Sequence, residues 1–167
     1  MRTRRILRQT SAILALLTAC HSGGTVPDDS IHVLVYNIHA GKDAARVENL
    51  SRVAEIVKDS GADIVLLQEV DNRTKRSGGV DQVARLRELT GYNGVFGKTI
   101  DYDGGEYGIA VLSRWPIVTT RFTRLPVTIS DSARAKYEER GALVATISAP
   151  GGDVRVVDTH LDAFGGD

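Results

Sequence analysis

Three polar residues stand at the ends of apolar segments and carry side chains suited to hydrolytic chemistry. Asn37 closes the segment HVLVYN, Glu69 closes IVLLQE, and His160 stands in VVDTHLD. Because α/β sheets place ligands at strand ends, we expect these side chains to converge on one edge. Carboxylate and amide oxygens are hard ligands that suit Mg²⁺, with Mn²⁺ as the alternative. A histidine beside such a metal can hydrogen-bond a phosphate oxygen, so the three residues would suit phosphoester hydrolysis.

Each of these residues also has an interpretation that needs no metal. Glu69 could accept hydrogen bonds from backbone N–H groups of the following loop, and Asn37 could shape a turn. His160 could be a hydrogen-bonded core histidine, which is the commoner case. Zn²⁺ is disfavoured because the sequence has no close pair of histidine or cysteine ligands. The functional interpretation therefore depends on the three residues meeting.

The segments that must position these residues predict alternating strands and helices. Residues 31–37 are typical of a strand, and apolar residues at helical spacing predict a helix over 46–60 that Gly61 ends. A strand over 64–69 and a second helix ending at Gly91 follow. Further strands are expected at 94–98, 108–114, 116–125, 140–148 and 154–161. The strand–helix–strand opening indicates a parallel pair and the short later connections indicate antiparallel pairs, so we expect a mixed sheet in an α/β or α+β domain.

The composition is that of one ordinary globular domain, since 42% of the 167 residues are hydrophobic and 25% are charged. The formal net charge is zero, which argues against the basic field of a general nucleic-acid binder. Aromatic residues make up only 5% of the chain and are not interleaved with basic ones, so stacked bases are not expected either.

The first twenty residues are typical of a bacterial export signal. Four arginines precede a short apolar run over 12–17, and LTAC follows, ending at Cys20. The run is too short for the alternative, a membrane-spanning anchor. LTAC resembles the lipoprotein box, which implies a lipidated Cys20, a polar tether over 21–30 and a location in the cell envelope outside the cytoplasm. In a Gram-negative host this would be the outer membrane. Removing residues 1–20 changes the net charge from zero to −4.

Five segments together resemble the endonuclease/exonuclease/phosphatase superfamily with its DNase I-like fold, in particular its bacterial metal-dependent hydrolases. They occur in family order and are LVYNIHAGKD, DIVLLQEVD, GGEYGIAVLSRWPI, ERGALVATI and VVDTHLD. The resemblance implies a Mg²⁺-dependent hydrolase of ester bonds acting on a phospholipid, nucleotide or nucleic acid, and it implies no specific protein partner.

The resemblance also implies roles residue by residue. Glu69 matches the principal metal-binding glutamate, Asn37 the asparagine near metal and phosphate, and His160 the histidine that stabilises the scissile phosphate. Tyr107 and Arg140 fall in patterns near the site; alternatively, Tyr107 belongs to a glycine-rich hairpin and Arg140 to a surface ion pair. Arg73, in DNRTKR, could line the path of the substrate phosphate or lie in a solvated loop.

The family fold is a four-layer α/β sandwich of two packed sheets, and two family motifs, GD-x-N and SDH, do not occur in this sequence. We therefore expect residues 31–167 to be the N-terminal portion of such a domain, with the first sheet and its helices present and the second sheet missing. As it stands the chain would be an inactive or incomplete enzyme. The alternative is a non-catalytic surface lipoprotein, a remnant of such an enzyme.

Overall fold

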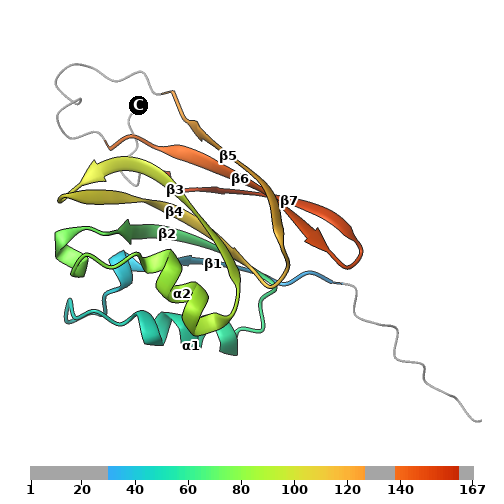
Figure 1. The fold of residues 1–167 in the computed structure, drawn as a ribbon, viewed down its shortest axis with the longest axis horizontal. Coiled ribbons are helices and arrows are strands. Elements are labelled where there is room, and N and C mark those ends of the chain that lie inside the picture. The colour runs from blue at the N-terminus through green and yellow to red at the C-terminus, as the bar shows by residue number, and fades with distance from the viewer. Residues whose placement is uncertain (1–29, 127–137, 162–167) are drawn as a thin grey trace, which may run out of the picture.

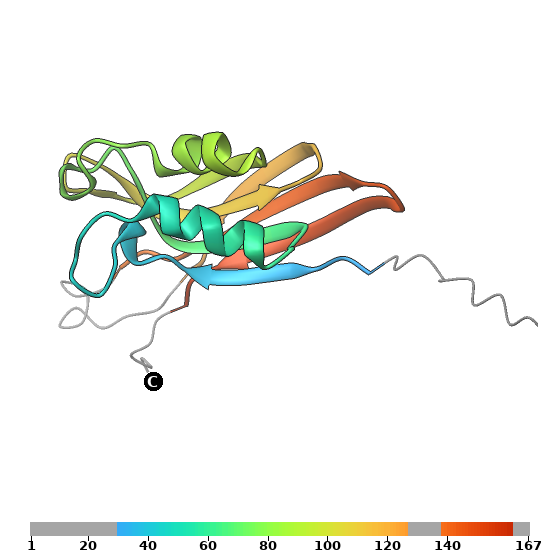
Figure 2. The same ribbon diagram turned by 90° about the horizontal axis from the view of Figure 1, so that it is seen from below.

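The computed structural model describes residues 30–126 and 138–161, which form two β-sheets packed face to face with two helices on one outer face (Figure 1). The expected export signal, Cys20 and all of the tether except Ser30 lie outside the described residues. The view from below shows the same helices along one side of the sandwich (Figure 2). No helix among the described residues has the length and apolar character needed to cross a membrane.

The first sheet has four strands in the order β1-β2-β4-β3. Its parallel pair is β1 and β2, and β4 runs antiparallel to both β2 and β3, which confirms the mixed sheet. The bounds are β1 Val33–Asn37, β2 Ile64–Asn72, β3 Asn93–Tyr102 and β4 Gly105–Ser113. The parallel pairing places Asn37, the last residue of β1, opposite Gln68, and β2 continues past the predicted end at Glu69 to Asn72 because it pairs with β4 on its other side.

The second sheet is antiparallel, in the order β5-β6-β7, with bounds β5 Ile117–Arg124, β6 Gly141–Ala149 and β7 Gly152–Thr159. The α/β DNase I-like architecture is therefore confirmed, but the expectation that the second sheet is missing is wrong. The later strands do not extend the first sheet; they turn back over its open face. The physical reason is that Ile109 and Val111 of β4 are apolar on the face away from the helices and are buried by Leu143 and Ile147 of β6.

The helices begin at side-chain caps and end at glycine-containing turns. Helix α1 covers Leu50–Asp59 and begins at Asn49, whose side chain accepts a hydrogen bond from the Arg52 N–H. It is shorter than the predicted 46–60 because of this cap, and Val47 lies outside the helix with 60% of its surface exposed. Helix α2 covers Gln82–Thr90 and ends at Gly91, whose left-handed φ of 77° stops the helix as predicted.

The core consists of two layers separated by the first sheet, and β2 contributes to both. Val65 and Leu67 face the helices, whereas Ile64 and Leu66 face the second sheet. This alternation is the period of two that any strand imposes on its side chains. Gln68 continues the series that faces the second sheet, so a polar side chain follows two apolar ones just before Glu69.

Candidate functional site

Asn37 and Glu69 meet at the edge of the first sheet. The Asn37 Nδ2 donates a 2.8 Å hydrogen bond to Glu69 Oε1, and the His39 backbone N–H donates a 3.0 Å bond to Asn37 Oδ1. Because the oxygen of the amide is fixed by the His39 N–H, its nitrogen must face the carboxylate. Asn37 therefore orients Glu69, while Glu69 Oε2 faces the Nδ1 atom of His39 at 3.5 Å.

Glu69 occupies a β-bulge with a left-handed backbone. The pairing between β2 and β4 shifts register between Leu67 and Val70, and Glu69 has a φ of 58°. The bulge places Val70, and not Glu69, on the helix side of the sheet. Bulges re-aim a side chain at the cost of ladder pairing, and here the carboxylate keeps 26% of its side-chain surface exposed. The sequence pattern of β2 gives no sign of this bulge.

Strained backbone is concentrated around this pair. Of the six described non-glycine residues with positive φ, five lie in β2 or in the loops after β1 and β2: His39, Ala40, Arg46, Glu69 and Arg73. Each such conformation costs on the order of 1–3 kcal/mol, and such strain gathers at functional sites because the surrounding structure has to hold it in place.

Gln82 connects the strained loop after β1 to the segment of β2 that follows Glu69. It is fully buried at the start of α2, its Nε2 donates to the Ala40 carbonyl at 2.7 Å, and its Oε1 accepts from the Asp71 N–H at 2.8 Å. One side chain thus joins the loop after Asn37 to the strand segment after Glu69. Sequence reasoning missed Gln82 because a glutamine in the first turn of a helix carries no signal of its own.

Glu69 and Arg140 both lie in the electrostatic surroundings of Tyr107. Tyr107 is buried in β4, and its burial raises the pKa of the phenol far above its usual value. The negative charges of Glu138 and Glu69 raise that pKa further, while Arg140 and Arg76 lower it. Arg140, whose side chain is only 12% exposed, donates a 2.7 Å hydrogen bond to Glu138. The ion pair expected of Arg140 is therefore present, but it lies half-covered beside Tyr107.

The cations of the DNRTKR loop have different roles. Arg76 donates two hydrogen bonds, at 2.7 and 2.8 Å, to the fully buried carboxylate of Asp71 and lies 4.4 Å above the ring of Tyr102. Burial by itself raises the pKa of Asp71, but hydrogen bonds from Arg76, Ser77 and Thr74 outweigh it and hold the pKa below its usual value. Arg76 is thus engaged within the fold, whereas Arg73 lies exposed in the left-handed region.

His160 follows β7 and reaches the same edge from the second sheet. Two residues earlier, Asp158 accepts a 2.7 Å hydrogen bond from Gln68 Nε2, which fixes the end of β7 beside β2. His160 is the first residue after Thr159, the last residue of β7, and it is half-buried. The end of β1, the Gln68–Glu69 segment of β2 and the end of β7 are therefore brought together.

The donor set around Glu69 fits a hard divalent cation with few protein ligands. Within residues 30–126 and 138–161 no three histidine, cysteine or acidic side chains lie close enough to enclose a metal. Mg²⁺ is commonly bound by one or two carboxylates together with water and substrate phosphate. The Oε2 atom of Glu69 could act as such a ligand, and Asn37 would hold the carboxylate in place, since both of its polar atoms are already hydrogen-bonded.

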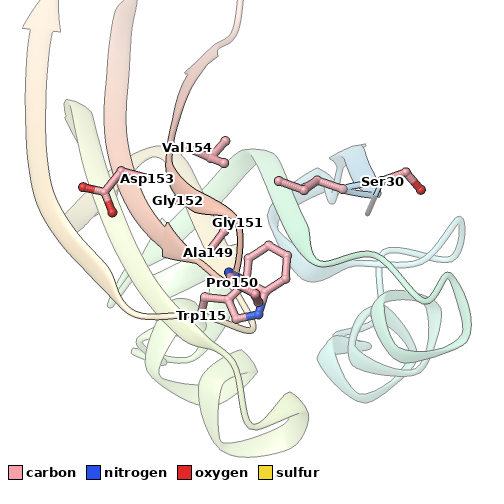
Figure 3. A pocket seen from close by; sticks show the side chains of 9 residues that line it. Ser30, Trp115, Ala149, Pro150, Gly151, Gly152, Asp153 and Val154 are labelled. Atoms are coloured by element: carbon pink, nitrogen blue, oxygen red, sulfur yellow. The ribbon is translucent and has the colours of Figure 1, made fainter. Parts of the chain in front are cut away.

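Two cavities differ in their relation to this edge. One of about 280 Å³ is lined by Asn37, His39, Lys42 and Arg52 among others, so it adjoins the candidate site. Another, of about 610 Å³, lies between the Trp115 turn and the β6–β7 hairpin, next to the start of β1 (Figure 3). That cavity is at the opposite end of β1 from Asn37, and Asp153 is its only ionisable lining residue. We therefore assign no chemistry to it.

Gln68, Asp158 and His39 are further residues that sequence reasoning did not select. Asp158 stands among valines and Gln68 is the single polar residue in IVLLQ, so a break in apolar alternation was the available signal. No sequence signal pointed to His39, because its approach to Glu69 depends on the left-handed turn η1, His39–Gly41.

Comparison with known proteins supports the same fold and family. Residues 34–157 match the model of the endonuclease/exonuclease/phosphatase family. An endonuclease/exonuclease/phosphatase from Beutenbergia cavernae is 30% identical with a TM-score of 0.66, over 81% of this chain and 39% of that one. A humanized D. rerio TDP2 (18% identity, TM-score 0.57, 79% of this chain and 47% of that one) and ANGEL2, a 2′,3′-cyclic phosphatase (16%, 0.55, 80% and 42%), share the fold.

The chain spans less than half the length of each of these three proteins. The family match nevertheless covers most of the chain and includes Asn37, Glu69 and Tyr107. On this match, and on the fold described above, the chain belongs to the endonuclease/exonuclease/phosphatase family.

Proposed function

We propose that the protein is a Mg²⁺-dependent phosphoesterase whose reaction takes place where the ends of β1 and β7 meet the bulge of β2. Its family consists of hydrolases that act on phosphoester bonds, and the proposal adds the site and the metal to that assignment. The observation that carries it is the hydrogen-bonded pair of Asn37 and Glu69, with Glu69 held in a left-handed bulge. A strand with no functional role would need neither the bulge at Glu69 nor the strained loop after β1.

Each side chain has a role that follows from its surroundings. Glu69 would hold the metal, and Asn37 would keep the carboxylate in a fixed orientation. His160 would hydrogen-bond the scissile phosphate. The hydroxyl of Tyr107 is protonated at neutral pH, as in any tyrosine, and its raised pKa keeps it a hydrogen-bond donor at alkaline pH as well. The metal, when bound, would neutralise charge developing on the phosphate and lower the pKa of water.

We propose a phospholipid, nucleotide or other small phosphoester as substrate in preference to duplex DNA. The support is electrostatic, because the chain without residues 1–20 has a net charge of −4 and so carries no general attraction for a polyanion. Lys42 lines the 280 Å³ cavity, and Arg73 lies exposed in the loop after β2. Either cation could bind a single phosphate group.

The test uses protein expressed from the complete reading frame of the gene. Phospholipid, linear and cyclic nucleotide, and duplex DNA substrates are assayed with Mg²⁺, with Mn²⁺ and with chelator. We expect metal-dependent turnover that falls by about three orders of magnitude in Glu69→Gln. Glu55→Gln, a change in an exposed glutamate of α1, serves as the matched control and should keep full activity. An inactive wild-type protein would favour the non-catalytic surface lipoprotein, and rapid cleavage of DNA alone would overturn the substrate preference.

We also propose lipid attachment at Cys20, which would tether the protein to the membrane in the cell envelope. The support is the arginine-rich start, the short apolar run and the single cysteine in LTAC. In fractionated cells the wild-type protein should sediment with membranes, and Cys20→Ser should move it to the soluble fraction. An unchanged membrane fraction in Cys20→Ser would contradict the lipid anchor.

A further inference from the structure

A buried polar pair joins the two sheets directly beside the candidate site. Along β2 the residues facing the second sheet are Ile64, Leu66 and Gln68; along β7 those facing the first sheet are Val154, Val156 and Asp158. In both strands the last member of an apolar series is polar. The two polar residues meet through the 2.7 Å hydrogen bond from Gln68 Nε2 to Asp158 Oδ1, and only 7% and 2% of their surfaces are exposed.

This pair is a poor way to stabilise the sandwich. The remaining contact between the sheets is apolar, built from residues such as Ile109, Val111 and Leu143. Asp158 is only 2% exposed, and this burial raises its pKa to about 7, although the hydrogen bond from Gln68 and the backbone N–H groups of Thr159 and Ala110 lower it. Replacing a buried polar pair by apolar groups of the same shape is commonly neutral or stabilising. A role other than stability is therefore needed to explain it.

The pair connects the two residues on which the proposed function rests. Glu69 follows Gln68 directly, and His160 lies two residues beyond Asp158, as the first residue after β7. Apolar contacts allow strands of facing sheets to shift against each other, whereas a hydrogen bond has a direction and a length. The bond is thus placed to set the separation between a residue of the first sheet and a residue of the second.

We propose that Gln68 and Asp158 are positioning residues, whose hydrogen bond holds His160 at a fixed place relative to Glu69. The inference rests on the proposed phosphoesterase function for its effect on turnover. Neither side chain contacts substrate in this proposal. Misplacement of a reacting group by about 1 Å can cost two orders of magnitude in rate, so the bond needs to restrict only a small movement.

The decisive variant replaces both partners, Gln68→Met with Asp158→Leu, in protein from the complete reading frame. We expect an unfolding midpoint equal to or above that of the wild type, a kcat lower by about tenfold or more, and a KM within about twofold. Asp158→Asn keeps the acceptor for Gln68 and should retain most of the kcat. Tyr92→Phe is the matched control, because it removes a buried 2.7 Å hydrogen bond to the Ala62 carbonyl at the other end of β2.

A second readout does not depend on activity. The imidazole signals of His160 are followed by NMR, assigned through His160→Gln. We expect them to shift or broaden in the double variant and to stay unchanged in Tyr92→Phe. Full kcat in the double variant, or unchanged His160 signals, would overturn the positioning role. If the wild type hydrolyses no phosphoester, the proposed function fails, while the NMR comparison still supports or overturns the positioning of His160.

Discussion

Replacement of Glu69 by glycine should leave the fold more stable than replacement by alanine, although both changes remove the same carboxylate. Glu69 has a φ of 58°, in the left-handed region, where a Cβ atom approaches the following carbonyl oxygen. Glu69→Ala loses the hydrogen bond from Asn37 and keeps the strained backbone. Glu69→Gly loses the same hydrogen bond but has no Cβ, so it relieves the strain.

The size of the difference follows from two opposing terms. A left-handed conformation costs a residue with a Cβ about 1–2 kcal/mol. Glycine has a more flexible unfolded chain than alanine, which offsets about 0.5–1 kcal/mol of that gain. We therefore expect the free energy of unfolding of Glu69→Gly to exceed that of Glu69→Ala by about 0.5–1 kcal/mol.

Urea unfolding at neutral pH in chelator measures this difference without contributions from bound metal. Glu55, in the middle of α1 and exposed, supplies a control of opposite sign. There Glu55→Gly should be about 1 kcal/mol less stable than Glu55→Ala, because glycine is unfavourable inside a helix. If glycine is also the less stable replacement at position 69, the left-handed bulge does not store the strain that we assign to it. Both Glu69 variants should lack metal-dependent turnover.

Three further predictions concern stability. Relative to Asp158→Asn, the wild type should lose on the order of 4 kcal/mol of stability between about pH 4 and pH 7, because the folded state keeps a proton with a pKa of about 7 that the unfolded chain releases near 3.8; urea titrations that give a constant difference would contradict this. Arg76→Ala should lower the free energy of unfolding by about 2 kcal/mol at pH 7, since it leaves the Asp71 carboxylate buried without its cation, and by less at pH 3, where that carboxyl begins to protonate. The value lies below that of a fully buried ion pair because Arg76 is partly exposed. Gly108→Ala should cost about 2 kcal/mol in thermal unfolding, because its Cβ would lie 2.1 Å from a carbonyl oxygen of β3, whereas Gly151→Ala, with open space around it, should be neutral.

The elements of the fold could largely be predicted from local patterns. Gly91 located the end of α2, and alternation located β5, β6 and β7. The assignment of those strands to a second sheet could not be predicted in this way. Strands that pair in one sheet and strands that turn back to cover it have the same alternation, and only the burial of both faces of β4 separates the two arrangements.

The candidate site was predictable in its residues but not in its contacts. Asn37 and Glu69 were expected to converge because both close apolar segments, and they meet at 2.8 Å. The prediction did not include the bulge at Glu69, since backbone conformation at a single residue is imposed by tertiary structure. Nor did it include Gln82, whose partners are 42 and 11 residues away along the chain. Contacts of that kind follow from the complete fold and not from a motif.

Near Glu69 the chain departs from ordinary packing and backbone preferences, and these departures are evidence for function that does not depend on family membership. Apolar alternation is broken at Gln68 and Asp158, and a left-handed backbone is imposed on Glu69. Each of these features lowers stability, and in β2 and β7 the residues before them follow the ordinary rules, with Ile64, Leu66, Val154 and Val156 all packed in the apolar layer. Sequences that fold well satisfy local and global preferences together and depart from them where function requires it. Because the polar break in β2 and β7 and the left-handed bulge lie next to each other, chemistry at that edge of the sheet explains them better than two separate accidents of packing.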